Sequence, residues 1–154
     1  MSKRRTIASA MTLTILMTCS SVWAVLGGSS GTLEVDHQPL SGQTRTIPGP
    51  DFSVHELTTP DLVVREYISG QGKVFGVSWT GRRSPDLPVL FGSYFEQYEA
   101  ASAERNARRS PLRGVTQVET SDLVVETGGP MGAIWGRAYL PNFLPPGVTK
   151  EAIQ

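Results

Sequence analysis

SPDLPVLFGSYFEQYEAASAERNARR, residues 84–109, carries the clearest helical pattern in this chain. Apolar side chains recur in it every three or four positions, a spacing that places them along one side of a helix. Ser84 or Asp86 can cap the first turn, and Pro111 ends the helix. The sequence therefore predicts one long amphipathic helix over residues 85–109. Its apolar stripe consists of Leu87, Leu90, Phe91, Tyr94, Phe95, Tyr98 and Ala101.

Strand-like segments lie on both sides of this helix. Gly70-Gln71-Gly72 separates two β-branched and aromatic runs, which is typical of a hairpin. Alternation in the second run puts Phe75, Val77 and Trp79 on one face. We therefore predict an α+β fold, in which an antiparallel β-sheet of about four to six strands has the long amphipathic helix packed on one face. The expected strands are Ser53 to Thr58, Leu62 to Ser69, Lys73 to Trp79, Gly114 to Glu119, Asp122 to Thr127 and Met131 to Leu140.

Residues 1–24 have the features of a secretory signal peptide. A cationic run at residues 3–5 precedes a short apolar stretch, and Val22-Trp23-Ala24 offers the small residue that signal peptidase requires at its cleavage site. The apolar part is too short for a membrane anchor, which needs about 20 apolar residues. The sequence thus predicts an exported protein, periplasmic or secreted, that meets the membrane only transiently through this peptide.

The rest of the chain is expected to form one domain with two irregular flanks. Residues 25–51 are rich in Gly, Ser and Pro, which predicts a lead-in with little regular structure. Residues 52–140 hold the predicted single α+β domain. Residues 141–154 contain three prolines and predict a Pro-rich C-terminal arm that lies over the domain.

Charge and cysteine content narrow the classes of partner. Removal of residues 1–24 would leave 11 basic and 14 acidic residues, a net charge of −3 that favours neither nucleic acid nor an anionic membrane surface. Cys19, the only cysteine, lies within the predicted signal peptide. The mature chain is therefore predicted to be cysteine-free, without a disulfide, a thiolate nucleophile or a cysteine-bound metal.

One short sequence occurs twice. Asp61-Leu62-Val63-Val64 recurs as Asp122-Leu123-Val124-Val125, and each copy begins a predicted hairpin that carries a tryptophan, Trp79 or Trp135. A duplicated ββ unit on either side of the helix would explain the repeat. Coincidence among common strand-forming residues is the alternative.

Five strand residues are candidates for ligand or partner binding. If they share the sheet face away from the helix, their rings and guanidinium group form a surface suited to a ligand or partner. If the C-terminal arm covers that face, they form a second small core instead. These residues are Tyr67, Trp79, Trp135, Arg137 and Tyr139.

No catalytic residue, metal site or cofactor is predicted. His37 and His55 are the two histidines, and they are not at the i, i+4 spacing that places two metal ligands on one helix face. The carboxylates on the predicted strands have neighbours of opposite charge. Glu126 with Arg137 fits a cross-strand ion pair at least as well as a catalytic site.

Six motifs of the chain are distinctive in their order and spacing: Val64-Arg65-Glu66-Tyr67-Ile68-Ser69, Val74-Phe75-Gly76-Val77-Ser78-Trp79-Thr80-Gly81, Pro85-Asp86-Leu87, Leu90-Phe91-Gly92-Ser93-Tyr94-Phe95, Asp122-Leu123-Val124-Val125 and Gly136-Arg137-Ala138-Tyr139-Leu140-Pro141. Together they resemble a bacterial family, the domain of unknown function 2844 family, whose members are small exported proteins of proteobacteria. The resemblance runs from about Leu26 to Ile153 and implies export and a single domain, with no activity, cofactor or catalytic residue to carry over. Gly129-Pro130-Met131 departs from the family pattern, where a Gly-His-Met type of sequence is expected.

These observations favour a non-catalytic binding or structural protein of the bacterial envelope, whose partner is an unknown envelope protein or a small ligand. The alternative is a small hydrolase that depends on carboxylates or on His55. Such an enzyme would need a concave pocket in which these titratable groups converge.

Overall fold

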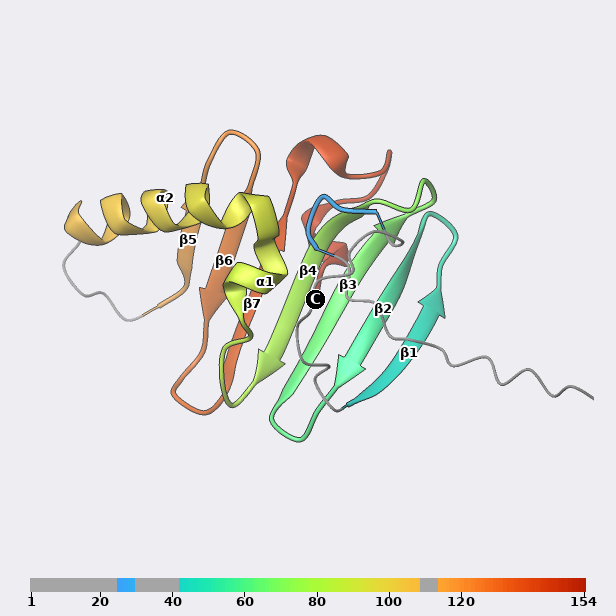
Figure 1. The fold of residues 1–154 in the computed structure, drawn as a ribbon, viewed down its shortest axis with the longest axis horizontal. Coiled ribbons are helices and arrows are strands. Elements are labelled where there is room, and N and C mark those ends of the chain that lie inside the picture. Colours follow the sequence, from blue (N-terminus) through green and yellow to red (C-terminus); the bar gives the residue numbers. More distant parts are fainter. Residues whose placement is uncertain (1–24, 30–41, 109–113) are drawn as a thin grey trace, which may run out of the picture.

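A computed structural model describes residues 25–29, 42–108 and 114–154. It shows one antiparallel sheet with a long helical segment on one face, which confirms the predicted α+β class (Figure 1). The predicted strand number was too low, because the sheet has seven strands. The predicted signal peptide and His37 lie outside the described residues. The strands are β1 (Gln43–Pro48), β2 (Phe52–Thr58), β3 (Leu62–Ser69), β4 (Val74–Gly81), β5 (Thr116–Glu119), β6 (Val124–Gly128) and β7 (Ile134–Tyr139).

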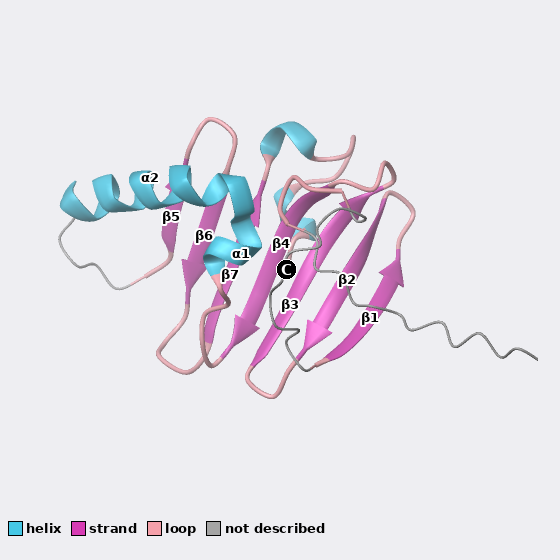
Figure 2. Cartoon of the chain, in the orientation of Figure 1, coloured by secondary structure: helices cyan, strands magenta, loops and turns pink. Residues whose placement is uncertain are grey.

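The sheet consists of two meanders that meet in its middle. The strand order is β1-β2-β3-β4-β7-β6-β5, so β4 of the first meander pairs with β7 of the second (Figure 2). The repeated sequence lies at the same turn in both. The Thr59 hydroxyl donates to the carbonyl of Leu62 at 2.9 Å and accepts its N–H at 3.0 Å. Thr120 makes the same two contacts with Leu123, at 3.3 and 3.1 Å.

Strand β1 lies inside the segment that was expected to be an irregular lead-in. All six of its residues are exposed, and it pairs with β2 through its main chain. A strand that buries none of its side chains has no alternating apolar pattern, so the sequence offered no signal for it.

The helical segment consists of α1 (Leu87–Phe91), a 3₁₀ turn η1 (Gly92–Tyr94) and α2 (Phe95–Arg108). Asp86 caps α1 by accepting a hydrogen bond from the N–H of Val89. The predicted long helix is confirmed, with an unpredicted break at Gly92, whose φ of 51° and ψ of −123° are unfavourable for other residues. A Cβ at Gly92 would also overlap the side chain of Val25.

The main core lies between the sheet and the helices, on the side called here the helix face. Trp79 is 1% exposed there and contacts Phe91, with ring centroids 6.0 Å apart. The stretch at residues 25–29 contributes Leu26, whose N–H bonds the carbonyl of Leu90. The buried residues of this core are Leu26, Leu62, Val64, Ile68, Val74, Val77, Trp79, Leu90, Phe91, Val118, Leu123, Val125, Ala138 and Leu140.

A second, smaller core lies on the opposite side, called here the arm face because residues 141–154 cross it. The arm contains the 3₁₀ turns η2 (Pro141–Phe143) and η3 (Lys150–Ala152). Its Ile153 is fully buried against the sheet, and its last residue reaches the middle of the sheet (Figure 1). The buried residues of this second core are Tyr67, Phe75, Val124, Tyr139 and Ile153.

A β-bulge divides β4 between the two cores. The β3–β4 register shifts at Tyr67 and Ile68, which pair with Gly76 and Val74 and leave Phe75 as the extra residue. Phe75 therefore belongs to the arm-face core, whereas Val77 and Trp79 belong to the helix face. The prediction that all three share a face was wrong, because simple alternation assumes a strand without a bulge.

Candidate functional site

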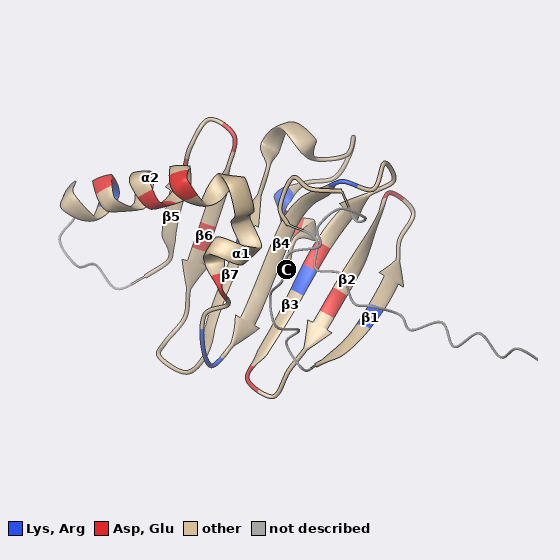
Figure 3. Cartoon of the chain, viewed as in Figure 1, with Lys and Arg blue, Asp and Glu red and all other residues tan. Residues whose placement is uncertain are grey.

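One transverse row of polar side chains crosses the arm face of the sheet. Each member is the register partner of the next, from β1 through β2, β3, β4 and β7 to β6. Opposite charges alternate on β1, β2 and β3 in Figure 3. The row, called here the polar row, consists of Arg45, Glu56, Arg65, Ser78, Arg137 and Glu126.

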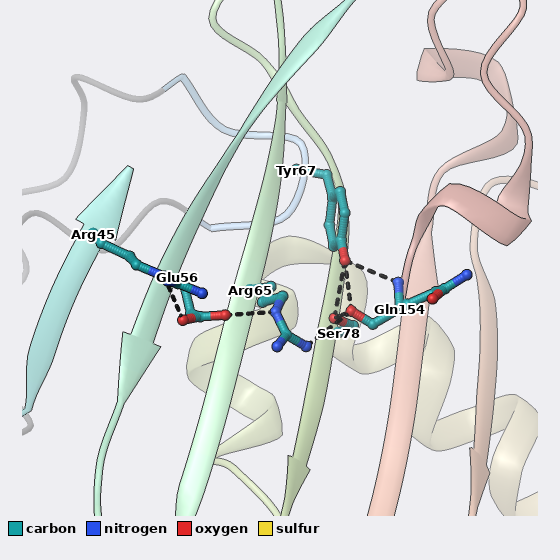
Figure 4. A network of polar contacts seen from close by, with 6 residues as sticks. All are labelled: Arg45, Glu56, Arg65, Tyr67, Ser78 and Gln154. Atoms are coloured by element: carbon teal, nitrogen blue, oxygen red, sulfur yellow. Dashed lines mark hydrogen bonds and ion pairs between the residues drawn. The ribbon is translucent and has the colours of Figure 1, made fainter. Parts of the chain in front are cut away.

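The first carboxylate of the polar row, Glu56, lies between two arginines. Arg45 Nε is 2.8 Å from Oε1 of Glu56, and Arg65 Nε is 2.7 Å from its Oε2 (Figure 4). Burial alone would raise the pKa of Glu56, but the hydrogen bonds and charges of the two arginines outweigh it and hold that pKa below its ordinary value. Glu56 is therefore a stable anion rather than a proton donor near neutral pH.

The second carboxylate, Glu126, has the same kind of surroundings. Arg137 donates to its Oε2 through Nε at 2.8 Å and also through Nη2, and Lys150 Nζ lies 3.4 Å from its Oε1. Burial again favours a raised pKa for Glu126, and the contacts with Arg137 and Lys150 lower it below the ordinary value. The pairing of Glu126 with Arg137 agrees with the expectation from their opposite charges.

The centre of the polar row binds the end of the arm. The main-chain oxygen of Gln154 accepts hydrogen bonds from Tyr67 Oη at 2.7 Å, Ser78 Oγ at 2.7 Å and Arg65 Nη1 at 3.1 Å (Figure 4). The N–H of Gln154 donates back to Tyr67 Oη at 2.8 Å. Arg137 Nη1 donates to the main-chain oxygens of Lys150 and Ile153, at 3.0 and 3.4 Å. The row therefore holds the arm by its main chain.

The structure separates the five candidate binding residues. Trp79 lies on the helix face, and the other four lie on the arm face. Tyr67 and Tyr139 are buried beneath the arm, where burial raises the pKa of Tyr139. Arg137 is engaged by Glu126 and by the arm, while Trp135 remains partly exposed.

Trp135 borders a cleft of about 310 Å³ beside the end of the arm. A Cβ on Gly128 would lie 2.9 Å from Cζ2 of Trp135, so the indole packs directly on the main chain of β6. Thr80, its register partner on β4, is exposed beside it. The full lining is Ser78, Trp79, Thr80, Trp135, Gly136, Arg137, Ile153 and Gln154.

A second, wider cleft of about 500 Å³ lies between the start of α1 and the side of α2. Pro85, Leu87 and Pro88 form one wall, and Phe95, Tyr98 and Ser102 lie on the other. Asp86 and Glu99 are its only acidic residues. Its lining contains no histidine and no basic residue.

His55 and Glu66 are the histidine and carboxylate that the register brings together. They are partners across β2 and β3 on the helix face, and neither lines either of the two clefts. Among residues 25–29, 42–108 and 114–154, no group of three His, Cys, Asp or Glu side chains could hold a metal ion. No helix in these same ranges is long and apolar enough to cross a membrane.

Sequence reasoning missed Glu56, Arg65, Ser78 and Gln154 as parts of one site. Each lies on a different element, and only the strand register places the first three in line. The side chain of Gln154 takes no part in these contacts, because its main-chain atoms bond to Tyr67 and Ser78. The alternation of Arg65 and Tyr67 on β3 was the one signal that could have placed Arg65 on the same face as a candidate binding residue.

A family comparison agrees with the resemblance in the motifs. The family model described as "Protein of unknown function (DUF2844)" matches residues 22–153. No curated protein and no solved structure matches the chain.

Proposed function

Because the chain belongs to the DUF2844 family, whose description assigns no activity, we propose a function from the sequence and the geometry. The protein is an exported, non-catalytic binding protein of the bacterial envelope, with the Trp135 cleft as its ligand site. The observation that carries the proposal is a difference in accessibility between two groups of side chains on the arm face. The polar row is engaged by its own members and by the arm, whereas Trp135 and Thr80 remain accessible at the cleft.

The chemistry of the cleft favours a small ligand or one protruding side chain of an envelope protein. A volume of about 310 Å³ lies at the lower end of the range for small-molecule sites, about 300–1,000 Å³. Trp135 supplies apolar contact, and Thr80 supplies a hydroxyl at the rim. An aromatic anchor beside a polar rim suits a ligand with one flat apolar group and nearby hydroxyls or amides.

The lowered pKa values support a binding role over the hydrolase alternative. A general acid near neutral pH needs a raised carboxyl pKa, and those of Glu56 and Glu126 are lowered. Export is proposed from the features of residues 1–24. Cleavage after Ala24 would keep Leu26, which packs in the helix-face core.

Ligand screening by tryptophan fluorescence tests the proposal. Envelope extracts and defined envelope components would be titrated into the full chain, followed by the change in Trp emission and in its quenching by acrylamide. We expect a saturable change in the wild type. Because substitution of Trp135 also removes the reporter, binding of the identified ligand by the variants is measured by isothermal titration calorimetry, in which Trp135→Ala should abolish binding and Trp135→Phe should reduce it. Met131→Ala is the matched control, because Met131 is fully exposed on the neighbouring turn and outside the cleft. Equal binding by the wild type and Trp135→Ala would refute the assignment.

A further inference from the structure

The end of the arm occupies a socket in the sheet. The Ile153 side chain is fully buried and lies over Gly76, where an added Cβ would be 2.7 Å from Ile153 Cδ1. Tyr67, Phe75 and Tyr139 belong to the same buried cluster. The missing side chain at Gly76 thus creates room for one branched aliphatic group from above.

Main-chain atoms of the arm are bound from the sheet beside this socket. The Gln154 oxygen is held by Tyr67, Ser78 and Arg65, and Arg137 donates to the oxygens of Lys150 and Ile153. One buried side-chain anchor combined with hydrogen bonds to main-chain groups is how proteins recognise short peptides. The groove thus contacts the main chain and one side chain of the segment that occupies it.

Residues 150–154 contact the sheet through side chains and hydrogen bonds to side chains, and they are not a strand of the sheet. The arm's own main-chain N–H groups close local turns, from Val148 to Pro145, from Ala152 to Thr149 and from Ile153 to Lys150. Pro146 and Gly147, upstream of the docked residues, are exposed. Release of residues 150–154 would therefore break side-chain contacts without opening a pair of strands among the described residues.

We propose that residues 150–154 are a tethered peptide ligand, and that their groove on the arm face is a peptide-binding site. Its ligand is a short peptide that forms a 3₁₀ turn like that of η3, followed by a branched aliphatic residue at the position of Ile153, with main-chain oxygens on both sides of that residue. The groove is distinct from the open part of the Trp135 cleft, so the proposal goes beyond the function proposed above and does not need a ligand for that cleft.

Peptide binding by the full chain tests the proposal. A fluorescently labelled peptide of residues 148–154, VTKEAIQ, would be titrated into the wild type and into Ile153→Ser, with fluorescence anisotropy as the readout. The wild-type arm competes from within the molecule at high effective concentration, so we expect the variant to bind the peptide at least about tenfold more tightly. The peptide VTKEASQ should bind the variant at least about tenfold more weakly than VTKEAIQ, because it lacks the anchor.

A substitution in the socket distinguishes peptide binding at this site from non-specific binding elsewhere on the protein. Gly76→Val combined with Ile153→Ser fills the space for the anchor and should remove peptide binding while thermal unfolding remains cooperative. Equal affinity of the variant for VTKEAIQ and VTKEASQ would overturn the proposal, as would unchanged binding after Gly76→Val.

A cleavable arm covers the case in which Ile153→Ser fails to fold. A protease site inserted between Pro146 and Gly147 would be cut in the folded wild-type background. The cut segment should stay bound and then exchange with an excess of labelled VTKEAIQ, as measured by mass spectrometry. Loss of the segment with global unfolding, or no exchange with excess peptide, would overturn the proposal.

Discussion

Glu56 of β2 and Glu126 of β6 lie in the same transverse row of the sheet, and each is held between two basic side chains. Their partners differ in origin. Glu56 binds Arg45 and Arg65 of the neighbouring strands, whereas Glu126 binds Arg137 of β7 and Lys150 of the arm. The row thus joins strands to one another at one end and joins the arm to the sheet at the other.

Arg137→Met should be the most damaging substitution in the polar row. It would leave the buried Glu126 without its main partner and remove the contacts with Lys150 and Ile153, and breaking such a buried pair costs about 3 kcal/mol of unfolding free energy. Arg45→Met is the matched control. Arg45 is 66% exposed, so its loss should cost less than about 1 kcal/mol. Urea unfolding measures both, and equal losses would contradict the structural ranking.

Acid should destabilise the protein through Glu56 and Glu126. Their folded pKa values lie below the ordinary value of 4.5, so at acid pH the unfolded chain binds more protons than the folded one. Their contribution to stability is present above that value and is lost as pH falls through the folded pKa values. We expect the unfolding free energy to be flat from pH 7 to about 5 and to fall below about 4.5.

Glu126→Gln checks the origin of this acid sensitivity. The variant starts less stable, and its unfolding free energy should fall less steeply below pH 4.5 than that of the wild type. A slope identical to the wild type would show that other groups cause the loss.

The two tryptophans on β4 and β7 should differ sharply when truncated. Trp79→Ala opens a large cavity beneath α1 and should cost about 3–5 kcal/mol. Trp135→Ala removes a partly exposed side chain at the edge of a cleft and should cost about 1 kcal/mol. Thermal and urea unfolding of both variants test this ordering. The reverse ordering would place Trp135, and not Trp79, in the main core.

Gly92→Ala should destabilise the break between α1 and α2. The new Cβ would meet the Val25 side chain, and φ of 51° with ψ of −123° adds strain of about 1–3 kcal/mol. Gly70→Ala is the control, because a Cβ there meets nothing within 4 Å. Combining Gly92→Ala with Val25→Ala should recover only the part due to the contact. Full recovery, measured by urea unfolding, would show that the backbone conformation carries no strain.

The elements that the sequence predicts well are those whose side chains are sorted by burial. The stripe from Leu87 to Ala101 lies against the core because it is apolar at helical spacing. Ala138 of β7 and Leu140, which follows that strand, both lie in the helix-face core. Exceptions arise where one residue changes the backbone. Gly92 breaks the helix without altering the stripe, and Phe75 reverses the faces of β4 without altering its composition.

The candidate site could be predicted only in pieces. Glu126 and Arg137 are recognisable as a pair, because they flank one turn of the chain and have opposite charges. The contact of Arg65 with Gln154 joins β3 to the end of the arm. These residues are far apart in the sequence, so no local sequence pattern predicts the contact. The sheet face on which Trp79 lies depends on the bulge at Phe75. Trp79 could therefore be assigned to the helix face only once the β3–β4 register was known.

The pairing of β4 with β7 has a consequence for how the protein folds. Each meander can form from its own tight turns as soon as its residues are available, but Gly76 and Tyr139 meet across a sequence separation of about sixty positions. Bringing such distant segments together costs loop entropy before any contact compensates for it, so closure of this junction is expected to set the folding rate. A chain synthesised from its N-terminus therefore cannot complete the sheet until β7 is available.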